Sequence, residues 1–346
     1  MTAGNVLPAA DIGALVHRGA GTEVFLVDAR PTGEHEFTAT ARLPHRHAYY
    51  NDLPDNPRGA DPLLLLEACR QAGSYLAHTA FELPLSTAFL VTGWEVRTRP
   101  AAQRLFEDGD GALTLHITAE NQVQRAGTVR SVRWRIALSA GRAELGEVVI
   151  GVVYAGATEY RALRTLQYGG PPPRSDALPD RPAGSPATPA EVGRARAENV
   201  LVAGLSTTAP VREARLAVPL RHPTLFVHPN DHFTALILTD AARQLCFARH
   251  ARATGAPAAG LALTGFTGTF SRFAELDAPV LLSIPEAPGG GAATAPAGTA
   301  GVEDTAAAED TVPAEGTVPV EVRQHDRTIA DLGITYAPVT AARRNA

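Results

Sequence analysis

The sequence contains the same short helical pattern twice. Residues 62–71 read Pro-Leu-Leu-Leu-Leu-Glu-Ala-Cys-Arg-Gln, and residues 235–244 read Ala-Leu-Ile-Leu-Thr-Asp-Ala-Ala-Arg-Gln. In each segment a carboxylate, an arginine and an amide share one helix face, because residues three and four apart are neighbours on a helix. Glu67 and Asp240 are 173 positions apart (240 minus 67), half of the 346-residue chain. We therefore predict two copies of one domain, with a candidate site on each helix.

Strand patterns surround each helix in a similar order. In the first half they cover residues 23–27, 36–41, 86–97, 112–121, 127–139 and 144–154, and a helix begins near Pro62, after the good N-cap residue Asp61. In the second half they cover 213–218, 261–273, 279–284, 318–325 and 328–336, with a helix over 236–250. One helix preceded by two strands and followed by four is typical of a hotdog domain, in which a curled antiparallel sheet wraps around a central helix. The predicted fold is α+β, a tandem double hotdog.

Composition predicts the domain boundaries. Residues 169–199 are rich in proline, glycine and serine, which is typical of an extended linker. This linker would separate a first hotdog domain over 1–168 from a second over 200–346. The Ala/Gly/Thr/Pro/Glu-rich stretch near 287–319 predicts a disordered insertion in the second domain. Two hotdogs in one chain can pair their sheets as two identical subunits would, so we expect a pseudo-dimer within a monomeric chain.

Charge and composition exclude several classes of partner. The net charge of −5 argues against nucleic acid, and no apolar run is long enough to span a membrane. The N-terminus has neither the basic nor the apolar region of a signal peptide. Cys69 and Cys246 lie in the repeated helices, where small buried thiols in a reducing cytoplasm are the simplest interpretation. The same use of cysteine leads us to expect a cytoplasmic protein. No glycine-rich phosphate loop occurs in a strand–loop–helix setting, so we expect no cofactor.

The polar face is longer on the first helix than on the second. Ser74 and His78 continue it beyond Glu67, whereas Phe247 occupies the position equivalent to Ser74. A partly buried carboxylate could act as a general base, helix amides could hold developing negative charge, and the arginines could hold an anion such as phosphate. Alternatively, each acid and arginine form an ion pair that only ties the helix surface. The candidate catalytic residues are Glu67 and Asp240, and the candidate substrate-binding residues on the helices are Arg70, Gln71, Arg243 and Gln244.

Histidines precede both helices. His228 and His232 have the spacing of a zinc pair on a helix, but Pro229 and the Asn-Asp pair predict a loop, and no third ligand is near in sequence. We therefore predict no metal site. These histidines could instead line the mouth of a substrate site, and His47 lies in a similar region before the first helix. The alternative is that all three pack their loops against the sheet.

Both halves resemble the A-factor biosynthesis (AfsA-type) family of double-hotdog proteins. In the first half the resemblance rests on residues 16–17, 23–26, 44–50 (Pro-His-Arg-His-Ala-Tyr-Tyr) and 61–71; in the second it rests on 226–232, 241–244 and 270–280. The resemblance implies an enzyme that transfers a β-ketoacyl group from acyl carrier protein, or from coenzyme A, to the hydroxyl of dihydroxyacetone phosphate or a similar small acceptor. Its product would lead to a γ-butyrolactone signalling molecule.

The second half departs from the family pattern at three places. Val-His-Pro at 227–229 stands where the family has Asp-His-Pro, Thr-Ala at 234–235 stands for Pro-Gly, and Asp240 stands for glutamate. Aspartate is one methylene shorter, which sets its carboxylate back by about 1.5 Å. We therefore expect the first helix to carry the working site. A hotdog dehydratase or thioesterase acting on acyl thioesters, and a non-catalytic acyl-binding hotdog, remain as alternative interpretations.

Overall fold

One antiparallel sheet runs through both halves of the chain. The computed structural model describes residues 9–19, 21–54, 59–107, 109–180, 184–207, 210–286 and 316–339. Within these residues the strands are β1 (Leu26–Pro31), β2 (Glu36–Arg42), β3 (Ala88–Thr98), β4 (Ala112–Arg125), β5 (Thr128–Ala140), β6 (Ala143–Ala155), β7 (Val202–Ala203), β8 (Glu213–Leu216), β9 (Leu261–Phe270), β10 (Leu281–Ser283), β11 (Thr317–Gln324) and β12 (Arg327–Pro338). Their order in the sheet is β1-β2-β4-β5-β6-β3-β9-β12-β11-β10-β8-β7.

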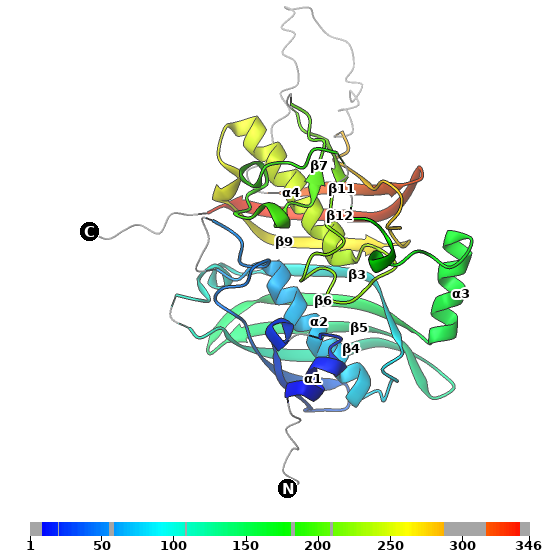
Figure 1. Ribbon diagram of the computed structural model, residues 1–346. Helices are drawn as coiled ribbons and strands as arrows, with labels where there is room; N and C mark the ends of the chain where they lie inside the picture. The colour runs from blue at the N-terminus through cyan, green and yellow to red at the C-terminus, as the bar shows by residue number, and fades with distance from the viewer. Residues whose placement is uncertain are drawn as a thin grey trace, which may run out of the picture.

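The two halves meet where β3 pairs with β9 in the middle of the sheet (Figure 1). Read outward from this pair, the strands of the two halves follow the same order, so the halves are copies joined edge to edge. Glycines allow the close approach: a Cβ added at Gly93 would lie 2.8 Å from the backbone oxygen of Gly268. This architecture, with one central helix in each half, confirms the predicted tandem double hotdog.

Two long helices lie against the sheet, α2 (Pro62–Thr79) and α4 (Ala235–Thr254) (Figure 1). Asp61 caps α2 by accepting a hydrogen bond from the Leu63 amide at 2.9 Å, and Pro62 follows as the first helical residue. Almost every residue of α2 is buried, including Glu67. The apolar surface around both helices explains why the sequence signal for them was strong. No helix in the described part of the chain is long and apolar enough to cross a membrane.

The segment before β1 differs from the prediction of a strand over 23–27. A 3-10 turn covers Gly21–Glu23, and β1 begins only at Leu26. The amides of Phe25 and Leu26 donate to the side-chain oxygen of Gln71 on α2, at 2.8 and 3.2 Å, instead of to a neighbouring strand. Two further helices were not predicted, α1 (Ala9–Leu15) and α3 (Ala157–Tyr168), and α3 stands at one side of the sheet (Figure 1).

The predicted linker contains a segment whose structure repeats that of the residues before Glu23. Gln71 donates to the carbonyl oxygen of Glu23 at 2.7 Å, and Gln244 on α4 donates to that of Asn199 at 2.9 Å. Glu23 and Asn199 are 176 positions apart (199 minus 23), so the residues before Asn199 repeat those before Glu23. They are also packed, since Val192 and Asn199 are each 1% exposed. The residues just before Asn199 are therefore packed rather than extended. The boundaries given for the linker over 169–199 stay a prediction, and we propose that the second domain begins before residue 188.

The predicted insertion near 287–319 lies mostly outside the described residues, which stop at 286 and resume at 316. Its last residues, 317–319, belong to strand β11. Alternating burial along β11 explains this assignment, because Val318 and Val320 face the core while Thr317 and Pro319 are exposed.

Candidate active site

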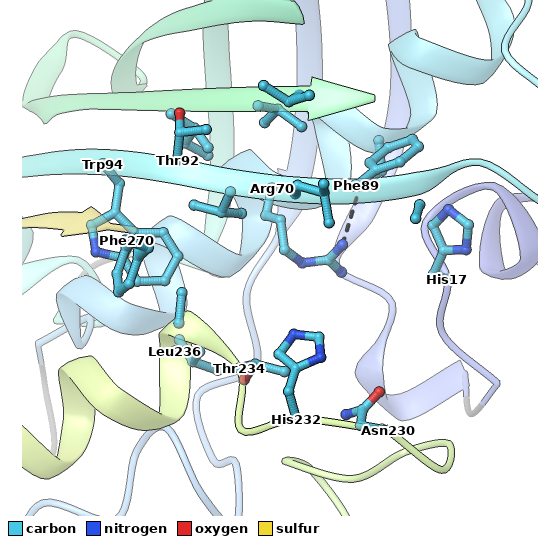
Figure 2. Close-up of a pocket in the computed structure, with 18 of the residues that line it drawn as sticks. His17, Arg70, Phe89, Thr92, Trp94, Asn230, His232, Thr234, Leu236 and Phe270 are labelled. Carbon is cyan, nitrogen blue, oxygen red and sulfur yellow. Dashed lines mark hydrogen bonds between the residues drawn. The ribbon is translucent and has the colours of Figure 1, made fainter. Parts of the chain in front are cut away.

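A cavity of about 610 Å³ lies between α2 and the beginning of α4 (Figure 2). Both halves of the chain line it. The first half contributes the N-terminal segment, helices α2 and α3, and strands β3, β5 and β6. The second half contributes the loop before α4, the first turn of α4, and the end of β9 with residues 271–273. Its polar residues include His17, Arg18, Glu67, Arg70, Ser74, Thr224, His228, Asn230 and His232. A cavity of this size, mostly apolar with a few polar groups gathered at one side, is typical of a small-molecule site.

The carboxylate of Glu67 is held by two arginines. Its side chain is 2% exposed. Arg18 donates from Nε to Oε1 at 2.9 Å, and Arg70 donates from Nε to Oε2 and from Nη2 to Oε1, both at 2.8 Å. Burial alone would raise the pKa of Glu67, but the two guanidinium groups lower it to about 2. Glu67 is therefore ionised, and its oxygens are occupied by strong donors.

Of the two arginines that bind Glu67, Arg70 is the one more exposed to the cavity. Its side chain is 28% exposed, whereas that of Arg18 is 10% exposed. Besides Glu67, it contacts the Ser74 hydroxyl at 3.2 Å and the carbonyl oxygen of Val16 at 3.1 Å. In Figure 2 its guanidinium group points into the same space as the labelled side chains of the loop before α4. The cluster of two arginines and one carboxylate presents a net positive charge there.

The two predicted substrate-binding glutamines lie away from the cavity and act as clamps. Gln71 joins α2 to the start of β1 through the Glu23, Phe25 and Leu26 backbone, as described above, and also donates to Glu67 at 2.9 Å. Gln244 accepts from the Leu201 amide at 2.8 Å, in the same manner. Because their amide groups are used by the backbone, a substrate-binding role for either glutamine is not supported by this geometry.

His17 and His78 form a pair at the cavity wall. Their Nε2 atoms are 3.0 Å apart, and Nδ1 of His78 lies 2.7 Å from the carbonyl oxygen of Leu83. A carbonyl only accepts, so His78 donates from Nδ1, and its Nε2 then accepts from Nε2–H of His17. Nδ1 of His17 is left with its lone pair. Burial, followed by His78 and Arg70, lowers the pKa of His17 to about 4, so it is neutral at pH 7.

The loop histidines separate into two groups. His228 and His232 line the cavity, and Nδ1 of His232 lies 2.7 Å from a carboxylate oxygen of Asp231. His47 instead shapes its own loop, because its Nδ1 accepts the amide of Tyr49 at 3.1 Å while its Nε2 lies 3.2 Å from Glu23. Among the described residues, no cluster of three or more His, Cys, Asp or Glu side chains could hold a metal ion.

The second copy of the helical pattern, around Asp240 on α4, is buried away from the cavity, and we call it the closed copy. The first copy, around Glu67 on α2, lines the cavity and is called the open copy. Asp240 is fully buried and receives hydrogen bonds from the Tyr49 hydroxyl, from Arg194 and from Arg243. Arg243 also donates to Asp61, the N-cap residue of α2. Burial opposes ionisation of Asp240, but the two arginines lower its pKa. Asp240, Arg243 and Gln244 thus belong to an internal network, rather than to the cavity wall where they were expected.

The sequence interpretation missed His17, Arg18 and Arg194, which is the counterpart of Arg18 in the second copy. Arg18 binds Glu67, and Arg194 binds Asp240, in equivalent positions of the two copies. They are 176 positions apart (194 minus 18), the same offset that relates Glu23 to Asn199. Valine precedes each arginine by two residues, at Val16 and Val192. This repeated Val-x-Arg pattern could have identified the two arginines from the sequence. It was not recognised because its second occurrence lies in a proline-rich region.

An apolar wall and a helix terminus complete the cavity. Trp94, Phe270 and Leu236 cluster on one side, away from Arg70 (Figure 2). Thr234, the N-cap residue of α4, makes no side-chain hydrogen bond to the first turn within the described structure, in contrast to Asp61 of α2. Since the first amides of a helix lack partners in the helix itself, this end of α4 can receive a negatively charged group.

Comparison with known proteins relates the chain to one family of biosynthetic proteins. A family model described as an A-factor biosynthesis hotdog domain matches residues 8–153 and 175–340. A 2-oxo-3-(phosphooxy)propyl 3-oxoalkanoate synthase from Streptomyces virginiae is 32% identical over 274 residues, which cover 77% of this chain and 83% of that protein. A synthase of the same name from Streptomyces griseus is 30% identical over 293 residues, which cover 84% and 90%. Among solved structures, a putative oleoyl thioesterase from Lactobacillus plantarum is 13% identical with a TM-score of 0.48, over 88% of this chain and 97% of that one.

Proposed function

This chain belongs to the A-factor biosynthesis hotdog family, and from that premise we propose that it is an acyltransferase which moves a β-ketoacyl group from a thioester to the hydroxyl of dihydroxyacetone phosphate. The relatives named above are synthases of a phosphooxypropyl oxoalkanoate, which is the ester that such a transfer yields. One observation carries the proposal: a single cavity joins an apolar wall to a cluster of arginines and a free helix N-terminus.

The reaction sets three requirements. The hydroxyl oxygen of the acceptor attacks the thioester carbonyl carbon, so a C–O bond forms and the C–S bond breaks. The hydroxyl loses a proton, and the departing sulfur takes one up. The site must therefore bind an acyl chain, bind a phosphate, and accept and return a proton while negative charge develops on the carbonyl oxygen.

The apolar wall fits the acyl donor. Trp94, Phe270 and Leu236 provide surface for a hydrocarbon chain, and burying such a chain favours binding by about 0.8 kcal/mol for each CH₂. In a thioester carried on acyl carrier protein, the carbonyl is at the end of the chain that is bonded to the sulfur, so it lies between the carrier arm and the hydrocarbon. The first turn of α4 lines the same cavity, and its backbone amides are suited to hold a negatively charged group there.

The arginine cluster fits the phosphate-bearing acceptor. We propose that Arg70 binds the phosphate, with His228 and His232 lining the same part of the cavity. Glu67 then has a positioning role, because it fixes Arg18 and Arg70 through the contacts described above. A carboxylate with a pKa of about 2 is a weak proton acceptor at neutral pH, so the general-base role predicted for Glu67 is less well supported than this one.

The better-placed proton acceptor is His17. It is neutral in the free protein and its Nδ1 lone pair is available. The hydrogen bond between its Nε2 and Nε2 of His78 fixes the orientation of the ring. Its low pKa of about 4 arises partly from nearby positive charge on Arg70. A bound phosphate would offset that charge and raise the pKa of His17 toward the working pH, where a base is most effective.

The second copy has a structural role in this proposal. Asp240, Arg194 and Arg243 form ion pairs whose side chains are at most 2% exposed, and Tyr49 occupies the position next to the carboxylate. One chain then holds one working site, built from both halves. We accordingly propose that a single chain is the catalytic unit.

The test is an assay of the purified protein with a β-ketoacyl carrier-protein thioester. Products are followed by mass spectrometry with dihydroxyacetone phosphate, with dihydroxyacetone, and without acceptor. The proposal expects the phosphorylated ester only with the phosphorylated acceptor. Thioester hydrolysis independent of acceptor would instead make the protein a thioesterase, and stable donor binding without any product would make it an acyl-binding protein.

A further inference from the structure

The two central helices correspond residue for residue, including their caps. Asp61 is the N-cap of α2 and Thr234 is the N-cap of α4, 173 positions apart (234 minus 61). The same offset relates Glu67 to Asp240 and Arg70 to Arg243. Each arginine can therefore be compared with its counterpart in the same structure, in one copy that is closed and one that is open.

The closed copy holds a carboxylate between an arginine and a helix terminus. Arg243 on α4 donates from Nη1 to Oδ2 of Asp61, on the opposite helix. The other oxygen, Oδ1, accepts the backbone amide of Leu63 in the first turn of α2 at 2.9 Å. The carboxylate thus bridges a guanidinium group of one half and the N-terminus of the helix of the other half.

The open copy has the same donors around the cavity. Arg70 on α2 is equivalent to Arg243, and Leu236 in the first turn of α4 is equivalent to Leu63 (236 minus 63 is again 173). Arg70, Thr234 and Leu236 all line the cavity. In Figure 2 the side chains of Arg70, His232 and Asn230 are turned toward one space, and Thr234 lies near His232. Threonine supplies no carboxylate there.

At four equivalent positions around the N-caps, the charges of the two copies differ by one. In the closed copy the negative charges of Asp240 and Asp61 balance the positive charges of Arg194 and Arg243. At the equivalent positions of the open copy, Glu67 faces Arg18 and Arg70, and Thr234 is neutral. Glu23, the counterpart of Asn199, is a buried carboxylate that acts electrostatically on Arg18. The missing negative charge is therefore local to the space between Arg70 and the N-terminus of α4, where an anionic ligand can bind.

From this comparison we infer an anion subsite between Arg70 and the first turn of α4, in which a phosphate monoester takes the place that the Asp61 carboxylate takes in the closed copy. The inference rests on the proposed function for the identity of the ligand, which is the phosphate of the acceptor. Arg70 and the amide of Leu236 are the primary donors. Asn230 and His232 are placed to donate to the remaining phosphate oxygens.

The subsite is tested by the substitution T234D, with T234N as the matched control. Both residues cap helices well and have the same shape, but only aspartate supplies the tethered carboxylate. Binding of inorganic phosphate and of dihydroxyacetone phosphate is measured by calorimetry, without a donor. We expect T234D to weaken the binding of both anions by at least about tenfold, because each loses one charge-assisted hydrogen bond. T234N should retain binding. T234D should also have the higher Tm of the two, because its carboxylate can pair with Arg70.

The outcomes separate this inference from the proposed function. If the wild type binds phosphate and T234D does not, the subsite stands whether or not acyl transfer is detected. If T234D binds phosphate as the wild type does, the subsite is refuted even when transfer occurs. If T234D loses transfer but keeps phosphate binding, the space serves the reacting oxyanion and the phosphate assignment is overturned. R70Q provides a second variant, whose folding is checked by its thermal unfolding transition and for which the same loss of phosphate binding is expected.

Discussion

Asparagine in place of Asp240 is expected to destabilise the protein without removing a catalytic group. The substitution leaves Arg194 and Arg243 buried, with side chains 1% and 2% exposed, and removes the negative charge that they share. Removing one partner of a buried ion pair costs about 3–5 kcal/mol. Arg243 retains Asp61, which places the expected loss near the lower end of that range. For a domain of about 150–250 residues each kcal/mol lowers Tm by about 2–4 °C, so a loss of about 3 kcal/mol should lower Tm by roughly 6–12 °C.

The assay compares D240N with E67Q, the same change of charge in the other copy. Thermal unfolding and acyl transfer are measured on both, with transfer at a temperature where both remain folded. Glu67 lies beside Arg70, which is 28% exposed toward the cavity, so water can solvate the arginine and the Tm loss in E67Q should be smaller. D240N should then turn over at close to the wild-type rate. A D240N protein with wild-type Tm and no turnover would refute the reasoning and make Asp240 part of the chemistry.

Four further predictions concern the open copy. E67Q should lower kcat and raise KM for the acceptor together, because Arg18 and Arg70 lose the group that fixes them; an unchanged KM would exclude this positioning role. H17N, in which asparagine tolerates the left-handed backbone of His17 (φ 57°), should lower kcat by about 10²–10⁴-fold. In the wild type, kcat/KM should fall only as the pH drops through about 4, because protonation of His17 removes its lone pair; a constant kcat/KM through that range would exclude His17 as the base. F270A should raise KM about tenfold or more for long-chain donors and little for an acetoacetyl donor, which measures the acyl wall directly.

The sequence predicted the parts of the site that local patterns encode. Asp61, Pro62 and the Glu67–Arg70–Gln71 spacing determine one helix and one face of it, so its position and its charged residues could be inferred. The orientation of Gln71 could not, because its amide binds backbone groups about 46 residues earlier in the chain. Arg18 and His17 were missed for the same reason: each meets its partner on α2 only after the N-terminal segment folds across the helix.

The inequality of the two copies follows from their being in one chain. In a dimer of identical halves, a single residue would occupy both N-cap positions. Aspartate at both would fill both anion positions with an internal carboxylate, and threonine at both would leave both arginine clusters with an unbalanced charge. A tandem chain can place Asp61 in one copy and Thr234 in the other. The closed copy then contributes buried ion pairs that join α2 to α4, and in our proposal the open copy leaves the equivalent anion position to a substrate.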